Sequence, residues 1–257
     1  MPASTTLLSK DENGPPRRAS WKYASVVGML LYLSSNSRPD IAFAVHQVAR
    51  FTHCAKFSHE KAILQIGHYI QATRNKGLRI NPNSSLNLEL FADADFAGLW
   101  NIEHPDDAIC VKSRTGYIIT LGGVPVTWSS KLQTEIATST MHAEYIALST
   151  GMRELIPVKH CLEYLCKRLN IQRSPETKCI KVWEDNEGTI RLAGGPIEKV
   201  TPHTKHFAIK YHWFREKLGE HNIVIKYIDT KVQKADILTK GLSLKEFTVK
   251  RNLLMGW

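Results

Sequence analysis

The sequence predicts an α/β protein in which a mixed β-sheet carries helices on its faces and follows a small helical segment. Two observations carry this prediction. Apolar residues recur every three or four positions over residues 21–78, which is the period of a helix, and an alternation of period two begins near residue 86. From there strands and helices alternate along the chain, an order typical of a sheet covered by helices.

The first part of the chain is expected to be helical after a short lead-in. Residues 1–20 hold several prolines and charges, which predicts a flexible lead-in. Helical periodicity follows in VVGMLLYL, in IAFAVHQVARF, and in a third stretch that we expect to begin after Ser58 as N-cap and to end before Gly77. The sequence therefore divides into the lead-in at 1–20, a helical segment at 21–80 and an α/β domain at 81–257, with NPNSS at 81–85 as the linker.

The later elements follow from changes of period. Alternation over residues 86–91 predicts a strand that runs into Asp93, and residues 115–131 predict a hairpin that turns at Gly122-Gly123. A long helix is expected from Thr140 to about Leu169, kinked or restarted at Pro157. Two further strands are expected at 179–185 and 222–228. Helices are expected after residue 185, at 204–218 and from 235 onward.

The composition favours an intracellular protein with an anionic partner. The chain has 34 Lys+Arg against 24 Asp+Glu, a formal net charge of +10, which favours polyanions such as nucleic acid. Its five cysteines form no C-x-x-C pair, which indicates reduced thiols and an intracellular location and disfavours a zinc site. The longest apolar stretch is too short to cross a bilayer, so no membrane partner is expected.

Four acidic residues stand at the ends of predicted elements. Asp93 and Asp185 end strands, Glu144 lies near the start of the long helix, and Asp236 opens the last helix. Strand ends and helix starts of an α/β sheet meet at one rim, where such folds bind ligands. Carboxylates held close together repel one another unless a cation such as Mg²⁺ binds them. Taken singly, each acid is more often a solvated surface residue or a charge that complements a helix N-terminus than a ligand.

Seven ordered segments carry a resemblance to a known family: FADADFAG, SRTGYIITLGG, WSSKLQ, STMHAEYIAL, WEDNEGTIRLA, TKHFAIKYHWFREK and QKADILTK. They resemble the ribonuclease H domain of copia-type retrotransposon Pol polyproteins. The stretch from YASVVGML to QVARF resembles the segment that joins the reverse transcriptase of that family to its ribonuclease H. The resemblance covers about residues 21–245. It implies a ribonuclease H-like fold with a five-stranded sheet. It also implies an enzyme that cuts the RNA strand of RNA–DNA hybrids with two Mg²⁺ ions, or with Mn²⁺.

The resemblance also implies a role for each of the four acids. Asp93 would be the central metal bridge, and Glu144 would support the second metal and position water or substrate. Asp185 would be the third ligand, and Asp236 would complete the set. Phosphate contacts are expected from four basic residues, although any one of them is more often plain solvated surface. These residues are Lys131, Lys205, Lys210 and Arg215.

Two acidic neighbours are not expected to be ligands. Alternation along a strand puts Asp95 on the same side as Asp93, and it puts Glu184 on the opposite side from Asp185. His142 stands where many members of the family have Glu, and we expect little effect on metal binding, because it faces elsewhere on the helix than Glu144.

Other functions remain open on the sequence. No Y-x-D-D hairpin typical of a polymerase palm is present, so we expect no DNA polymerisation from this chain alone; the polymerase of the polyprotein would be a partner. One alternative is a catalytically inactive fragment that binds nucleic acid without cutting it. Another is an integrase-like transposase, which would use three acids and for which Asp236 would be dispensable.

Overall fold

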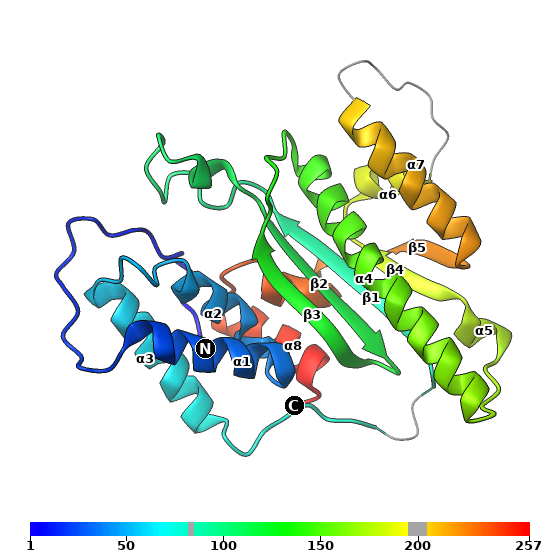
Figure 1. Cartoon of the computed structure of the whole chain (residues 1–257), viewed down its shortest axis with the longest axis horizontal. Coiled ribbons are helices and arrows are strands. Elements are labelled where there is room, and N and C mark those ends of the chain that lie inside the picture. The colour runs from blue at the N-terminus through cyan, green and yellow to red at the C-terminus, as the bar shows by residue number, and fades with distance from the viewer. Residues whose placement is uncertain (82–84, 195–204) are drawn as a thin grey trace.

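A single five-stranded sheet forms the centre of the computed structural model (Figure 1). The structure describes residues 1–81, 85–194 and 205–257, and at 205–211 it describes only the backbone. Its strands are β1 (Leu88–Asp95), β2 (Arg114–Leu121), β3 (Val124–Leu132), β4 (Ile180–Glu184) and β5 (Ile223–Tyr227). They lie in the order β3-β2-β1-β4-β5. The β3-β2-β1 pairs are antiparallel, and the β1-β4-β5 pairs are parallel. The predicted mixed five-stranded sheet is confirmed.

The β2–β3 hairpin turns where the sequence predicted it. Gly122 and Gly123 have φ angles of 58° and 83°, in the left-handed region that a type I′ hairpin turn requires of both central residues. The predicted linker at 81–85 lies mostly outside the described residues, and so does the connection at 195–204.

One face of the sheet is covered by the later helices. These are α4 (Thr140–Arg168), α6 (Glu187–Gly194) and α7 (Lys205–Glu220), with the short α5 (Pro175–Lys178) beyond α4. Leu90 and Val182 of the sheet pack in one core with Tyr145 and Met152 of α4. The helix does not restart at Pro157, because α4 runs unbroken through that residue, and the alternative of a kink there stays a prediction. A proline removes one intrahelical hydrogen bond, and α4 carries buried side chains that hold it to the sheet on both sides of this position.

The helical segment covers the opposite face of the sheet. Its helices are α1 (Tyr23–Asn36), α2 (Ala42–Ala49) and α3 (Phe57–Ala72), and the C-terminal α8 (Leu244–Met255) joins them (Figure 1). Phe91 and Ile118 of the sheet belong to the same apolar core as Val45 and Ile66 of these helices. Trp128 of β3 donates its indole N–H to Ser34 O at 2.7 Å. The helical segment and the sheet therefore share one core, and the division of the chain at residue 80 stays a prediction.

The lead-in contains no helix or regular strand, yet it contacts the helical segment along its length. The backbone N–H groups of Arg18 and Ala19 donate to the Glu60 carboxylate at 2.9 and 3.0 Å. The carbonyl of Ser9 contacts the His59 ring at 2.7 Å. The expected N-cap at Ser58 is wrong: α3 begins at Phe57, and the His59 ring accepts a hydrogen bond from the Lys56 N–H at 2.8 Å, which satisfies the helix start.

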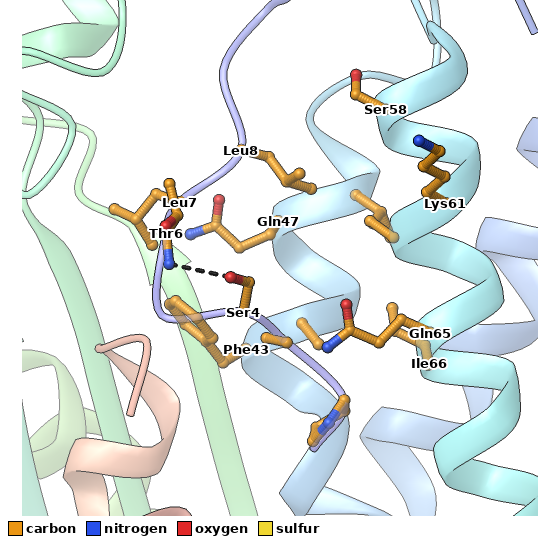
Figure 2. Close-up of a pocket in the computed structure, with 15 residues that line it drawn as sticks. Ser4, Thr6, Leu7, Leu8, Phe43, Gln47, Ser58, Lys61, Gln65 and Ile66 are labelled. Atoms are coloured by element: carbon orange, nitrogen blue, oxygen red, sulfur yellow. Dashed lines mark hydrogen bonds between the residues drawn. The ribbon is translucent and has the colours of Figure 1, made fainter. Parts of the chain in front are cut away.

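A cavity of about 150 Å³ lies between the lead-in and helices α2 and α3 (Figure 2). Leu8 of the lead-in, Phe43 and Gln47 of α2 and Ile66 of α3 are among its lining residues. The lining contains no acidic, histidine or cysteine side chain, so it offers neither a metal ligand nor a nucleophilic thiol. None of the helices in the described residues is long and apolar enough to span a membrane.

We expect Gly116→Ala to destabilise the protein by about 1–3 kcal/mol, the usual cost of overpacking a filled site. Gly116 pairs with Asp93 across β1 and β2. A Cβ at Gly116 would come within 2.6 Å of the Thr239 side chain, 2.9 Å of Leu238 Cβ and 3.1 Å of Ala235 O. Urea unfolding measures the loss. Gly67→Ala is the control, since nothing lies within 4 Å of its added Cβ; an equal loss there would refute the packing argument.

Candidate metal centre

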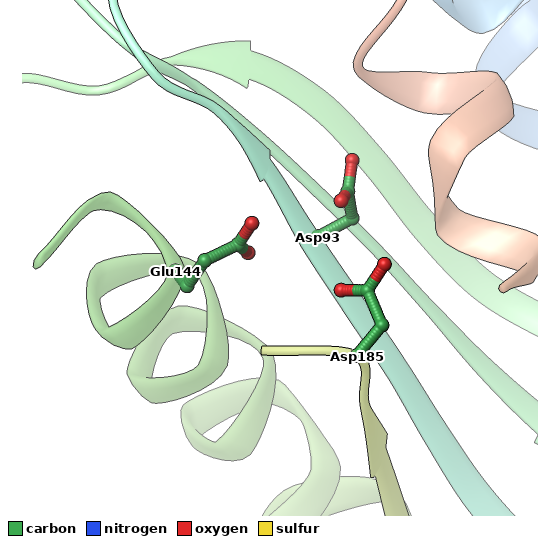
Figure 3. A group of neighbouring side chains, drawn as sticks. All are labelled: Asp93, Glu144 and Asp185. Atoms are coloured by element: carbon green, nitrogen blue, oxygen red, sulfur yellow. The ribbon is translucent and has the colours of Figure 1, made fainter. Parts of the chain in front are cut away.

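Three of the four predicted acids meet where β1, β4 and α4 come together. Asp93 lies near the end of β1, Asp185 directly follows the parallel strand β4, and Glu144 lies early in α4, whose N-cap is Ser139. Each offers a carboxylate oxygen, and these oxygens lie within 4.8 Å of one another. Figure 3 shows the three side chains turned toward a common point. We call this group the acidic triad.

Burial makes the triad costly without a cation. Asp93 is fully buried and Glu144 nearly so, whereas Asp185 is half-buried. Burial raises the pKa of Asp93 to about 7; the Lys240 ammonium opposes this rise, and the nearby Asp236 carboxylate adds to it. Burial, followed by the Asp93 charge, raises the pKa of Glu144 well above its usual value. The triad therefore favours bound protons or a bound cation.

The residues of the triad fit a divalent ion with a preference for oxygen ligands. Glu144 Oε2 is buried and has no hydrogen-bond partner among the described residues. Such an orphaned oxygen is rare in a folded protein, and a bound ion is one of its ordinary explanations. Asp185 Oδ2 accepts a hydrogen bond from Thr230 Oγ1 at 2.7 Å, which orients that carboxylate. Carboxylate oxygens from separate elements are the ligands that Mg²⁺ and Mn²⁺ prefer.

Asp236 lies elsewhere than the sequence predicted. It sits in the short 3₁₀ helix η5 (Lys234–Leu238), whereas α8, the last helix, begins only at Leu244 behind a capping box of Ser243 and Glu246. Asp236 Oδ1 lies 3.0 Å from Lys240 Nζ, and its Oδ2 lies 2.8 Å from Lys250 Nζ. Both oxygens therefore bind ammonium groups, and the structure does not place Asp236 in the triad. Its role as a metal ligand stays a prediction.

The sequence reasoning missed the residues that follow Asp236. Lys240 Nζ also lies 3.1 Å from Asp93 Oδ1, and the Thr239 hydroxyl donates to Asp93 Oδ2. The paired carboxylates raise the pKa of Lys240 against the effect of its burial. The four-residue spacing of Asp236 and Lys240 in KADILTK was the available signal, because side chains at that spacing meet on a helical turn.

Asp95 and Glu184, the two acidic neighbours of the triad, differ in burial. Asp95 is half-buried and is not one of the three residues of the triad. Glu184 is fully buried, and its charge contributes to the raised pKa of Glu144, so it lies closer to the triad than the sequence predicted. The reason is that β4 ends at Glu184. The alternation of a strand does not extend to Asp185, and the two side chains are not forced onto opposite sides.

The predicted phosphate contacts are placed only in part. Lys131 is exposed near the end of β3, and Arg215 is half-buried in α7. Lys205 and Lys210 belong to α7, but their side chains lie outside the described residues. Nucleic-acid contact by these four residues stays a prediction.

We expect the stability of the metal-free protein to fall, relative to an Asp93→Asn variant, as the pH rises from about 4 to about 7. The folded protein holds the Asp93 proton more tightly than the unfolded chain, because its pKa is raised from 3.8 to about 7. The resulting stabilisation is complete below the unfolded pKa and is lost as the pH rises through the folded pKa. Unfolding free energies of both proteins in EDTA measure the difference. A constant difference over this range would contradict the raised pKa.

Transposon polyproteins are among the relatives of the chain. The chain is 34% identical over 226 residues to the retrovirus-related Pol polyprotein from transposon RE1 of Arabidopsis thaliana. The matched residues make up 88% of this chain and 14% of the relative. The chain is 33% identical over 232 residues to the retrovirus-related Pol polyprotein from transposon TNT 1-94 of Nicotiana tabacum. The matched residues make up 90% of this chain and 16% of that relative. The chain thus spans less than a fifth of the length of these relatives.

No protein-family model matches the chain. The crystal structure of LC11-RNase H1 in complex with an RNA/DNA hybrid aligns at a TM-score of 0.38 and 18% identity, over 60% of this chain and 94% of that one. The sequence matches extend over nearly the whole chain. The chain belongs to the retrovirus-related Pol polyproteins of copia-type transposons.

Proposed function

We propose that this chain is a metal-dependent endonuclease that hydrolyses the RNA strand of RNA–DNA hybrids. The acidic triad carries the proposal, because three carboxylates from separate elements converge within 4.8 Å and one buried oxygen has no partner among the described residues. Their sequence motifs resemble the ribonuclease H part of the family, and the positive charge of the chain suits a nucleic-acid substrate.

Each residue of the triad would have a role that follows from its position. Asp93 and Asp185 would hold Mg²⁺ from the ends of two adjacent parallel strands, and Glu144 would approach from α4. When bound, the ion supplies positive charge for the phosphodiester oxygens and lowers the pKa of attacking water. Glu144 would orient that water from the helix side of the triad. The hybrid would be held through its backbone shape and 2′-hydroxyl groups.

Cleavage of a labelled RNA–DNA hybrid with Mg²⁺ tests the proposal directly. We expect the purified full chain to cut the RNA strand of the hybrid and to leave single-stranded RNA and duplex DNA intact. EDTA should stop the reaction, and Mg²⁺ or Mn²⁺ should restore it. Cleavage that persists in EDTA would rule out the metal centre, and equal cleavage of single-stranded RNA would rule out the hybrid as the specific substrate.

A second candidate is a fragment that binds nucleic acid without cutting it. The observation that favours it is the pairing of Asp236 with Lys240 and Lys250, because both oxygens of this carboxylate are then occupied. Retarded migration of the hybrid in a gel, with no cleavage in Mg²⁺ or Mn²⁺ and no change on Asp93→Asn, would support this candidate over the nuclease.

A further inference from the structure

Lys240 brings a fixed positive charge into the group of acids. Its Nζ lies 3.1 Å from Asp93 Oδ1 and 3.0 Å from Asp236 Oδ1, so one ammonium joins the two carboxylates. The side chain is 36% exposed, whereas the Asp93 side chain is only 1% exposed. The ammonium thus lies at the outer edge of a buried acidic group, on the side away from the protein core.

The acids around Lys240 are unequally supplied with partners. Asp236 uses one oxygen on Lys240 and the other on Lys250. Asp93 uses one oxygen on Lys240 and the other on the Thr239 hydroxyl. Glu144 in contrast has a buried oxygen without a partner among the described residues. The carboxylate without a counter-charge is therefore that of Glu144, whereas both oxygens of Asp236 are already paired with ammonium groups.

We propose that Lys240 is a positioning residue whose ammonium stands in for a second divalent ion, so that the centre binds one ion at the acidic triad. An ammonium is a compact point charge with several donors, and it can hold two carboxylates together as a metal ion would. Lys240 is covalently attached, so its charge does not depend on the metal concentration. This inference rests on the proposed metal centre. It predicts one bound ion, whereas the sequence resemblance implies two.

Counting bound Mn²⁺ tests the inference without reference to cleavage. Equilibrium dialysis of the full chain against Mn²⁺, with the free ion measured by electron paramagnetic resonance, gives the number of ions bound per chain. We expect one ion for the natural sequence and for Lys240→Arg, which keeps the charge. We expect two ions for Lys240→Met, because Asp93 and Asp236 then each lose a counter-charge. Lys245→Met, at an exposed lysine of α8, should bind one ion.

The outcomes separate this inference from the proposed function. Two ions on the natural sequence, or one ion on a folded Lys240→Met chain, would overturn the role of Lys240 and leave the metal centre intact. No bound ion on any of the four proteins would overturn the metal centre as well. Circular dichroism shows whether Lys240→Met folds; if it does not, the count on the natural sequence and on Lys240→Arg still decides, since two ions on either would refute the inference.

Discussion

Asp93→Asn is expected to lower the rate of hybrid cleavage by about 10³-fold or more. Asp93 lies in the triad with Glu144 and Asp185 and also pairs with Lys240. Replacing its carboxylate by an amide removes a charged ligand. The loss of about 4 kcal/mol of stabilisation by a bound ion corresponds to about three orders of magnitude in rate. Single-turnover cleavage of the labelled hybrid in saturating Mg²⁺ measures the effect.

The fold should tolerate this substitution. An Asn side chain at residue 93 keeps the size of the Asp and can still accept a hydrogen bond from the Thr239 hydroxyl, which donates to Asp93. The change also removes a buried charge that burial makes unfavourable, as its raised pKa of about 7 shows. We therefore expect a cooperative melt for Asp93→Asn in EDTA, together with a loss of Mn²⁺ binding.

Asp95→Asn is the matched control. Asp95 lies on the same strand, two residues on, and is acidic and partly buried, but it is not part of the triad. Its cleavage rate should remain close to that of the natural sequence. An equal loss in both variants would indicate that charge on this strand, and not metal binding at Asp93, supports the reaction. Full activity of Asp93→Asn would remove the triad from the mechanism.

The fold could be predicted because its signals are local. Alternation around Leu88 and Leu90, and the glycine pair at Gly122-Gly123, predict strands and their turn from the residues of those elements alone. The packing of the helical segment on the sheet could not be predicted in this way. It depends on which apolar stripe meets Phe91 and Ile118, and this is a long-range choice that no periodicity records. For the same reason the sequence left open whether the helix restarts at Pro157, whereas α4 runs unbroken through it.

The candidate site was predictable in its acids but not in its cations. Asp93, Glu144 and Asp185 occupy ends of elements whose positions follow from the sheet order, so a common rim was expected. Asp236 was assigned to the last helix, because the helical signal from residue 235 does not reveal that the chain forms η5 and then reaches α8. Lys250 lies fourteen residues beyond Asp236, and only the folded arrangement of α8 against η5 brings them together.

The second large effect is expected for Lys250→Met, which should lower the free energy of unfolding by about 3 kcal/mol. Removing one partner of a buried ion pair costs about 3–5 kcal/mol, and the lower end applies because Lys240 still binds Asp236. Lys250 Nζ also donates to Gln233 O at 2.9 Å and to Thr230 O, and Met can satisfy neither carbonyl. For a protein of this size the loss corresponds to a decrease in Tm of about 6–12 °C.

A double-mutant cycle shows whether the effect of Lys250 runs through Asp236. Lys250→Met should cost less in an Asp236→Asn background, because the buried carboxylate that loses its partner is then already neutral. Lys245→Met on the exposed side of α8 should change the stability by no more than about 0.5 kcal/mol. If the two losses simply add, the contribution of Lys250 comes from the carbonyls of Thr230 and Gln233. Lys250 would then stabilise the contact of α8 with the chain around η5 without acting on Asp236.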